Sequence, residues 1–204
     1  MKTDIVLAAS SDTIARALEI LHTGGLVAFP TDTVYGVGSL AFDSKAVESI
    51  YTAKDRPLEK AIPVLIGGVE DLDEVAMDIP NTARTLASRF WPGPLTILLP
   101  KKRSVPEAVS ATSTVGVRVP DHPIARALLR AAGPMAVTSA NLSGHASPTT
   151  ASEVFAQLGG RIGLIIDGGK TPGGVPSTLV DCTGDEIRIL RPGPITEEEL
   201  RYAL

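Results

Sequence analysis

The chain has little cysteine and histidine and no excess of positive charge. Its 204 residues include one cysteine and three histidines, and 19 Lys and Arg stand against 23 Asp and Glu, a net charge of -4. The single cysteine, Cys182, excludes an internal disulfide framework. The charge balance argues against a protein dominated by nonspecific binding to nucleic-acid backbones, although a local basic pocket is compatible with it.

Motifs that would indicate metal or nucleophile chemistry are also absent. The sequence contains no HExxH, paired CxxC or acidic calcium loop, so we expect no tightly bound metal. Neither the Walker-type Gly-Lys-Ser/Thr nor the dinucleotide glycine spacing occurs. His22, His122 and His145 lie in unrelated settings, and Cys182 lies in an apolar run that predicts a packed strand. Any catalysis should therefore depend on positioning and charge, not on covalent attack.

Long hydrophobic segments are missing too. No window approaches the roughly 18 unbroken apolar residues of a membrane span. The apolar run at residues 5–9 falls short of the roughly 7–15 residues in the core of a signal peptide, so residues 1–10 are predicted to be an uncleaved first strand. We therefore expect a soluble protein in the reducing cytoplasm, with no membrane partner.

Helical and strand patterns alternate along the chain. Hydrophobic residues make up 44% and charged residues 21%, and no linker, repeat or low-complexity tract interrupts them, so we expect one domain over residues 1–204. Periodicity predicts helices over residues 11–22 (capped by Ser10 or Ser11), 43–52, 81–90, 123–132, 151–158 and 197–202. Strands are predicted over residues 26–29, 62–66, 95–99, 115–119, 135–138, 162–166, 178–182 and 186–190. This order predicts an α/β sheet covered by helices.

Four polar clusters border predicted strands, at residues 54–57, 114–118, 139–144 and 176–178. Cations, hydroxyls and amides gathered at one sheet edge indicate a site for an anionic small molecule. In the first cluster region Lys54, Arg56 and Lys60 place three cations within seven residues of a predicted loop. Such a group suits a triphosphate, and the alternative is a solvated surface.

Arg118 lies within an apolar run, where an unpaired charge is costly. Strand alternation places it on the same face as Gly116, away from the neighbouring valines. It could point into a cleft and bind a ligand's carboxylate, lie at a solvent-facing edge, or form an internal salt bridge. Arg191 ends the last predicted strand, and a salt bridge at the rim is its simplest interpretation.

Three further segments have both functional and structural interpretations. Ser139, Asn141 and Ser143 follow a strand and could orient a polar ligand or form turn hydrogen bonds. Residues 30–38 carry Thr31, Thr33 and two glycines, which suit either close approach to a ligand or a tight turn. Residues 167–177 are predicted to be a lid or a long turn.

Seven short motifs follow one another along the chain: Pro30-Thr-Asp-Thr-Val-Tyr-Gly, Lys54-Asp-Arg-Pro, Phe90-Trp-Pro-Gly-Pro-Leu-Thr, Val115-Gly-Val-Arg-Val-Pro, Ser139-Ala-Asn-Leu-Ser-Gly, Pro176-Ser-Thr-Leu-Val-Asp and Leu190-Arg-Pro-Gly. In this order they resemble the YrdC/TsaC family, the threonylcarbamoyl-AMP synthases. The resemblance runs from about residue 11 to the end and is to the short, single-domain type. It implies a twisted mixed sheet flanked by helices, with a concave basic cleft.

The resemblance also implies an activity and a set of residues. The family forms L-threonylcarbamoyladenylate and pyrophosphate from L-threonine, bicarbonate or CO2, and ATP, for the threonylcarbamoyladenosine modification of tRNA. Mg²⁺ would accompany ATP, and separate proteins would transfer the product to tRNA. The implied threonine-binding residues are Thr33, Arg118, Ser139 and Ser177. The implied ATP-binding residues are Arg56, Lys60, Thr114, Asn141, Thr149 and Arg191, and catalysis would involve Lys54, Arg56, Ser139 and Asn141.

Two positions depart from the pattern of some relatives, since Leu65 stands where these have a histidine and Lys60 where they have an asparagine. Two other hypotheses compete with the synthase. One is a noncatalytic RNA-binding module that uses the same cleft, with direct tRNA contact. The other is a carbamoyl-transfer component like the related domain of hydrogenase maturation proteins, whose acylphosphatase and zinc-finger regions this sequence lacks.

Overall fold

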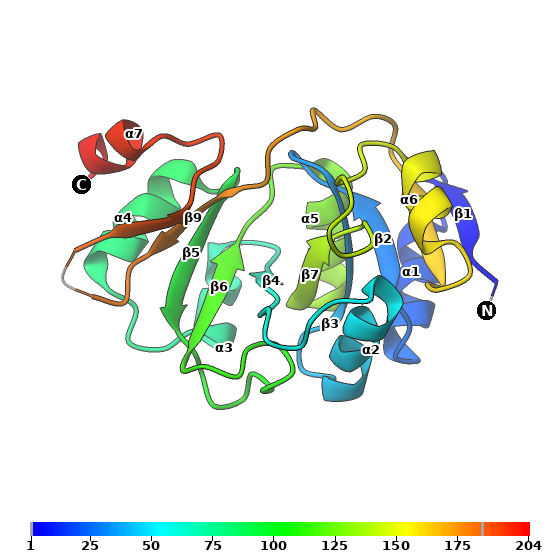
Figure 1. The fold of residues 1–204 in the computed structure, drawn as a ribbon, viewed down its shortest axis with the longest axis horizontal. Helices are drawn as coiled ribbons and strands as arrows, with labels where there is room; N and C mark the ends of the chain where they lie inside the picture. Colours follow the sequence, from blue (N-terminus) through cyan, green and yellow to red (C-terminus); the bar gives the residue numbers. More distant parts are fainter. Residues whose placement is uncertain (1, 185) are drawn as a thin grey trace.

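Ten strands form one mixed sheet in the computed structural model, which describes residues 2–184 and 186–204. The strand order is β1-β8-β2-β3-β7-β4-β6-β5-β9-β10, and β1 and α7 lie at opposite ends of the molecule (Figure 1). The strands are β1 (Asp4–Leu7), β2 (Val27–Pro30), β3 (Tyr35–Leu40), β4 (Val64–Leu65), β5 (Leu95–Pro100), β6 (Thr114–Arg118), β7 (Met135–Ser139), β8 (Leu164–Asp167), β9 (Thr178–Asp181) and β10 (Arg188–Arg191). Parallel pairs such as β5 with β9 adjoin antiparallel pairs such as β5 with β6.

The helices begin where local sequence signals start them. Before α2 the Asp43 side chain accepts a hydrogen bond from the backbone N–H of Ala46. Helix α5 begins with Pro123, which has no N–H, and an N–H at this first position would have no partner within the helix. The helices are α1 (Thr13–His22), α2 (Ser44–Lys54), α3 (Leu72–Val75), α4 (Asn81–Phe90), α5 (Pro123–Ala132), α6 (Ala151–Leu158) and α7 (Glu197–Tyr202), with a 3-10 turn at Val69–Asp71. None of the helices in the described ranges is long and apolar enough to cross a membrane.

The predicted helices at 81–90, 123–132, 151–158 and 197–202 are confirmed at both ends. Each of the eight strands predicted between residues 26 and 190 exists, but differs from the observed strand by one or two residues at one or both ends. Other predictions are wrong in detail. The first helix is capped by Asp12, whose side chain makes no capping hydrogen bond, and not by Ser10 or Ser11. The second helix continues to Lys54. Strand β3, the 3-10 turn and α3 were not predicted, and Met1 of the predicted first strand lies outside the described residues.

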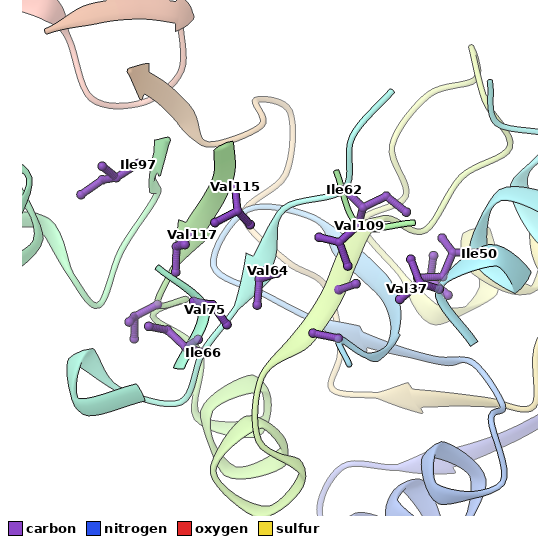
Figure 2. Packing of buried hydrophobic residues seen from close by; sticks show 14 of the residues in the cluster. Val37, Ile50, Ile62, Val64, Ile66, Val75, Ile97, Val109, Val115 and Val117 are labelled. Atoms are coloured by element: carbon purple, nitrogen blue, oxygen red, sulfur yellow. The ribbon is translucent and has the colours of Figure 1, made fainter. Parts of the chain in front are cut away.

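One face of the sheet is covered along most of its width. Alternate strand residues such as Val64, Val115 and Val117 pack there with apolar residues from α2, α3, α4 and α6. Figure 2 shows part of this core, with Val37 of β3 beside Ile50 of α2. Burial of this apolar surface is the main source of the fold's stability.

The opposite face is covered over only part of the sheet. Residues of α1 and α5 pack there against Val27, Phe29 and Val137 of strands β2 and β7. Beyond them, on β4, β6, β5 and β9, the residues that point to this face line a cavity: Leu65, Gly116, Arg118, Thr96, Leu98 and Leu179. The sheet therefore provides a packed support on one side and a floor for a binding site on the other.

Candidate functional site

A cavity of about 320 Å³ lies over the uncovered part of the sheet. Strands β4, β5, β6 and β9 form its floor, and loops before and after other strands form its walls. Seven of the eleven site residues suggested by the sequence line it: Thr33, Arg56, Thr114, Arg118, Ser139, Ser177 and Arg191. Leu65, the position that departs from some relatives, also lines the cavity. The structure thus brings together residues that are up to 158 positions apart, from Thr33 to Arg191.

Arg118 is held rigidly in the floor of this cavity. Its Nη2 donates to Asp32 Oδ1 at 2.5 Å, its Nη1 to Thr33 Oγ1 at 3.3 Å and its Nε to the Gly93 carbonyl at 3.0 Å. Two of the interpretations from sequence are therefore correct together, because Arg118 forms an internal salt bridge and also faces the cleft, while the solvent-facing edge is wrong. A guanidinium has five N–H donors, so two are left for a ligand.

Arg56 and Arg191 differ from Arg118 in having only neutral partners. Arg56 donates to the carbonyls of Lys60 and Ala61, and Arg191 donates to the carbonyl and hydroxyl of Ser177. Neither forms a salt bridge with any carboxylate in the described parts of the chain, so the predicted rim salt bridge of Arg191 is wrong. Burial lowers the pKa of both guanidiniums. Two charges without a carboxylate, beside a third arginine, suit an anionic ligand.

The hydroxyl groups of Thr96, Ser110 and Thr112, which the sequence analysis did not single out, also line the cavity. Thr96 Oγ1 lies 2.8 Å from Ser177 Oγ. Ser110, Thr112 and Thr114 form a row in which neighbouring hydroxyl oxygens are 3.0 Å apart. Strand alternation could not have predicted this row, because Ser113 also carries a hydroxyl and only Thr114 belongs to a strand.

Four suggested residues do not line the cavity: Lys54, Lys60, Asn141 and Thr149. Lys54 is the last residue of α2, not part of a loop, and is only 1% exposed. Its Nζ donates to the carbonyls of Ser139 and Asn141, and its own carbonyl accepts from Ser143 N–H at 2.8 Å. The alternative of a solvated surface is therefore wrong for Lys54. Its side chain and its carbonyl instead hold the segment that runs from the end of β7 to Ser143. Burial, with a smaller effect of Arg56, lowers the pKa of Lys54 to about 7.

The other three residues also lie outside the cavity lining. Asn141 Nδ2 donates to the carbonyls of Leu142 and His145, which is the turn chemistry that the sequence left open. Its buried Oδ1 has no hydrogen-bond partner among the described residues. Thr149 donates to Glu153, and its carbonyl accepts from Thr171 N–H in the loop before β9. Lys60 has an exposed side chain and contributes its carbonyl to Arg56.

Asp55 explains how Arg56 reaches the cavity. It ends α2 in the left-handed conformation, with φ 51° and ψ 45°, and the Arg56 N–H closes the turn on the Tyr51 carbonyl. Aspartate tolerates this conformation better than most residues that carry a side chain.

Within residues 2–184 and 186–204 no group of three or more His, Cys, Asp or Glu could hold a metal ion.

The fold and the cavity define a class of protein: a mixed α/β sheet with an arginine-lined cavity on one face, suited to a small anionic ligand. Residues 19–193 match the Sua5/YciO/YrdC family, which is described as "Telomere recombination". The chain belongs to this family.

Relatives and solved structures agree with that membership. The chain is 45% identical to the threonylcarbamoyl-AMP synthase of Bacillus subtilis, over 97% of this chain and 58% of that protein. It is 41% identical to a putative threonylcarbamoyl-AMP synthase of Mycobacterium tuberculosis, over 94% of this chain and 88% of that protein. The crystal structure of Pyrococcus abyssi Sua5 complexed with L-threonine superimposes with a TM-score of 0.94 at 42% identity, over 100% of this chain and 61% of that chain. The chain thus spans less than two thirds of two of these relatives.

Proposed function

We propose that this protein is a threonylcarbamoyl-AMP synthase. It would form L-threonylcarbamoyladenylate and pyrophosphate from L-threonine, bicarbonate or CO2, and ATP, for the modification of tRNA in the cytoplasm. The observation that carries this proposal is the convergence of Arg56, Arg118 and Arg191 on one cavity that is otherwise lined by hydroxyls. Relatives named for this activity, over most of the chain, support the same assignment.

The cavity offers a place for each substrate. Arg118, with two free donors, binds the threonine carboxylate, and Thr33, Ser139 and Ser177 surround the rest of that amino acid. Arg56 and Arg191 bind the phosphates of ATP, because their charges have no carboxylate partner. The remaining ATP contacts come from Thr114 at the start of β6 and from three residues outside the cavity lining, Lys60, Asn141 and Thr149. Among the catalytic group, Arg56, Ser139 and Asn141 act on the reactants, and Lys54 positions the last two through their backbone carbonyls.

The chemistry needs no nucleophile from the protein. The threonine amine forms an N–C bond to CO2 and loses a proton, and a carbamate oxygen then attacks the α-phosphorus of ATP. A P–O bond forms as the bond to the β-phosphate breaks, and pyrophosphate leaves. Arg56 and Arg191 offset the negative charge that gathers where carbamate meets phosphate. Mg²⁺ bound to the ATP phosphates would supply further charge neutralisation.

The protein's own thiol does not compete with this mechanism. Cys182 is buried, and burial raises the pKa of its thiol to about 12. A thiol so protonated at neutral pH is a poor nucleophile. The labile adenylate would pass to separate threonylcarbamoyl-transfer proteins, with or without direct contact between tRNA and this chain.

The direct test is ATP-to-pyrophosphate turnover by the purified protein with Mg²⁺ and bicarbonate, with and without L-threonine. We expect threonine-dependent release of pyrophosphate and an adenylate with the mass of threonylcarbamoyl-AMP. Folded protein that binds RNA in a salt-sensitive way without turnover would instead support the RNA-binding module.

Substitution of Arg56 tests the site itself. We expect Arg56→Ala to lower turnover by about 100-fold or more, as is typical when a group that stabilises transition-state charge is removed. The fold should persist, because the side chain bonds only to the neighbouring carbonyls of Lys60 and Ala61. Arg84→Ala is the control, since Arg84 is exposed and pairs with Asp73 outside the cavity lining. Unchanged turnover in Arg56→Ala would contradict the site.

A further inference from the structure

A directed chain of hydrogen bonds runs through the turn after β2, beside the proposed threonine site. Thr31 and Thr33 both line the cavity and are 3% and 5% exposed. The Thr31 hydroxyl donates to the Val34 carbonyl at 2.7 Å. The two threonine oxygens lie 3.0 Å apart, and Thr31 Oγ1 also accepts from the Thr33 N–H at 3.2 Å.

These contacts determine which hydroxyl is the donor. A hydroxyl has one proton and two acceptor positions. Since Thr31 gives its proton to Val34, the contact between the two threonines must be donated by Thr33. Thr31 Oγ1 then accepts from both the hydroxyl and the N–H of Thr33, which uses its full capacity.

Arg118 closes the other end of the chain. Its Nη1 donates to Thr33 Oγ1, and Asp32 holds the guanidinium in place through Nη2. Asp32 is in turn held by the backbone N–H of Asp121 at 3.1 Å. Thr33 therefore accepts one bond from Arg118 and donates its proton to Thr31. One acceptor position is left on its oxygen, and no proton is left for the cavity.

We infer that Thr31 is a positioning residue that makes Thr33 a hydrogen-bond acceptor toward the cavity. The inference rests on the proposed function, and it adds a rule for substrate recognition. Arg118 selects a carboxylate, and Thr33 selects an N–H or O–H donor on the same amino acid. A ligand that offers only an acceptor at that point would leave two acceptors facing each other, which is unfavourable in a buried site.

Substrate analogues test this polarity in the wild-type protein. L-2-Aminobutyrate lacks the threonine hydroxyl, and O-methyl-L-threonine keeps the oxygen but has no proton on it. If Thr33 accepts from the hydroxyl, both analogues should show KM values about tenfold above that of L-threonine. If O-methylthreonine matches threonine while aminobutyrate is weaker, the oxygen accepts from the protein and the inference is overturned. If the KM of aminobutyrate equals that of threonine, the donor to Thr33 is the amine and not the hydroxyl. The effect of Thr31→Val on KM for threonine then supports or overturns the inference.

Thr31→Val removes the group that takes the proton of Thr33. That proton is then free to point into the cavity, so we expect KM for threonine to rise about tenfold with KM for ATP within about twofold. The ratio of KM for O-methylthreonine to KM for threonine should fall, which a purely structural defect would not cause. Thr31→Ser keeps the hydroxyl and should restore wild-type values.

Thr13→Val is the matched control. Thr13, the first residue of α1, is similarly buried and lies outside the cavity lining. Its hydroxyl donates to the carbonyl of Leu7 at the end of β1. We expect it to lower the melting temperature without changing either KM. Equal changes in both KM values, or none, in Thr31→Val would overturn the inference while wild-type turnover leaves the proposed function standing. Absence of threonine-dependent turnover in the wild type would contradict the proposed function instead. If Thr31→Val does not fold, Thr31→Ala, which also removes the hydroxyl, takes its place with the same expected and contradicting outcomes.

Discussion

At the scale of single residues, Lys54 has an environment that a sequence pattern does not reveal. A buried ammonium normally requires a carboxylate, yet Lys54 bonds to two carbonyls. A neutral amine has two N–H donors and satisfies both carbonyls equally well. Burial therefore favours the neutral form and lowers the pKa to about 7.

This lowered pKa predicts a dependence of stability on pH. Below about pH 7 Lys54 is charged in both the folded and the unfolded chain, so the cost of burying the charge is fully present. Between pH 7 and the unfolded value of 10.5 the unfolded chain binds one more proton, so the free energy of unfolding rises with pH. We expect denaturant titrations to show that, from pH 7 to pH 10, the free energy of unfolding of the wild type rises relative to that of Lys54→Met by about a few kcal/mol. The control is Lys45→Met, which changes an exposed lysine on the same helix. A pH-independent difference for Lys54→Met would contradict the assignment.

At the scale of the element, β6 combines two tasks by alternation. Val115 and Val117 pack into the core, while Gly116 and Arg118 lie on the cavity face. A Cβ added at Gly116 would approach Thr96 Cγ2 to 3.1 Å and Pro63 Cβ to 3.6 Å. Glycine at this position thus keeps the floor beside Arg118 open.

Filling this floor should reduce binding more than stability. We expect Gly116→Val to weaken threonine binding about tenfold or more, because the branched side chain occupies ligand space, with the fold retained since valine favours strands. Gly116→Ala is the graded control and should have a smaller effect, because its methyl group requires only a small shift of Thr96. Calorimetric titration with L-threonine measures the binding, and thermal unfolding reports on the fold. Unchanged affinity in Gly116→Val would place the ligand elsewhere.

At the scale of the whole molecule, the site exists because one sheet face is incompletely covered. Helices α1 and α5 pack against the part of that face that includes β2 and β7. The adjoining strands β4, β6, β5 and β9 are not covered there and form the floor of the cavity. Loops from distant parts of the chain surround that opening and are tied to it, as when Gly173 N–H donates to the Thr33 carbonyl at 2.8 Å. Ligand binding should therefore stabilise the entire fold.

That coupling predicts a shift in thermal unfolding. A ligand present at about 100 times its Kd stabilises the folded state by about 2.7 kcal/mol. We expect α,β-methylene-ATP alone to raise the melting temperature of the wild type and of Arg84→Ala, and to raise that of Arg56→Ala much less. The non-cleavable analogue separates binding from turnover. An equal rise in Arg56→Ala would show that Arg56 does not bind the nucleotide.

Strand β3 shows why part of the fold escaped prediction. Its sequence, Tyr-Gly-Val-Gly-Ser-Leu, contains two glycines and has low strand propensity. It forms because it pairs with β2 and β7. Glycine at position 38 permits the close approach to β7, since a Cβ there would lie 2.4 Å from the Ala136 carbonyl oxygen. Pairing with β7, which is distant in sequence, overrides the local preference, and no local window around β3 contains β7.

The sequence by itself determined the periodic elements, the alternation that turns Arg118 away from the valines, and the clusters of cations and hydroxyls that mark the site. These properties depend on residues a few positions apart, so local patterns express them. Only the tertiary structure decided that Asp32 pairs with Arg118, that Lys54 lies behind the site, and that Ser110 and Thr112 join it. Such outcomes depend on which strands become neighbours and on which face the helices leave open, and these follow from packing over the whole chain.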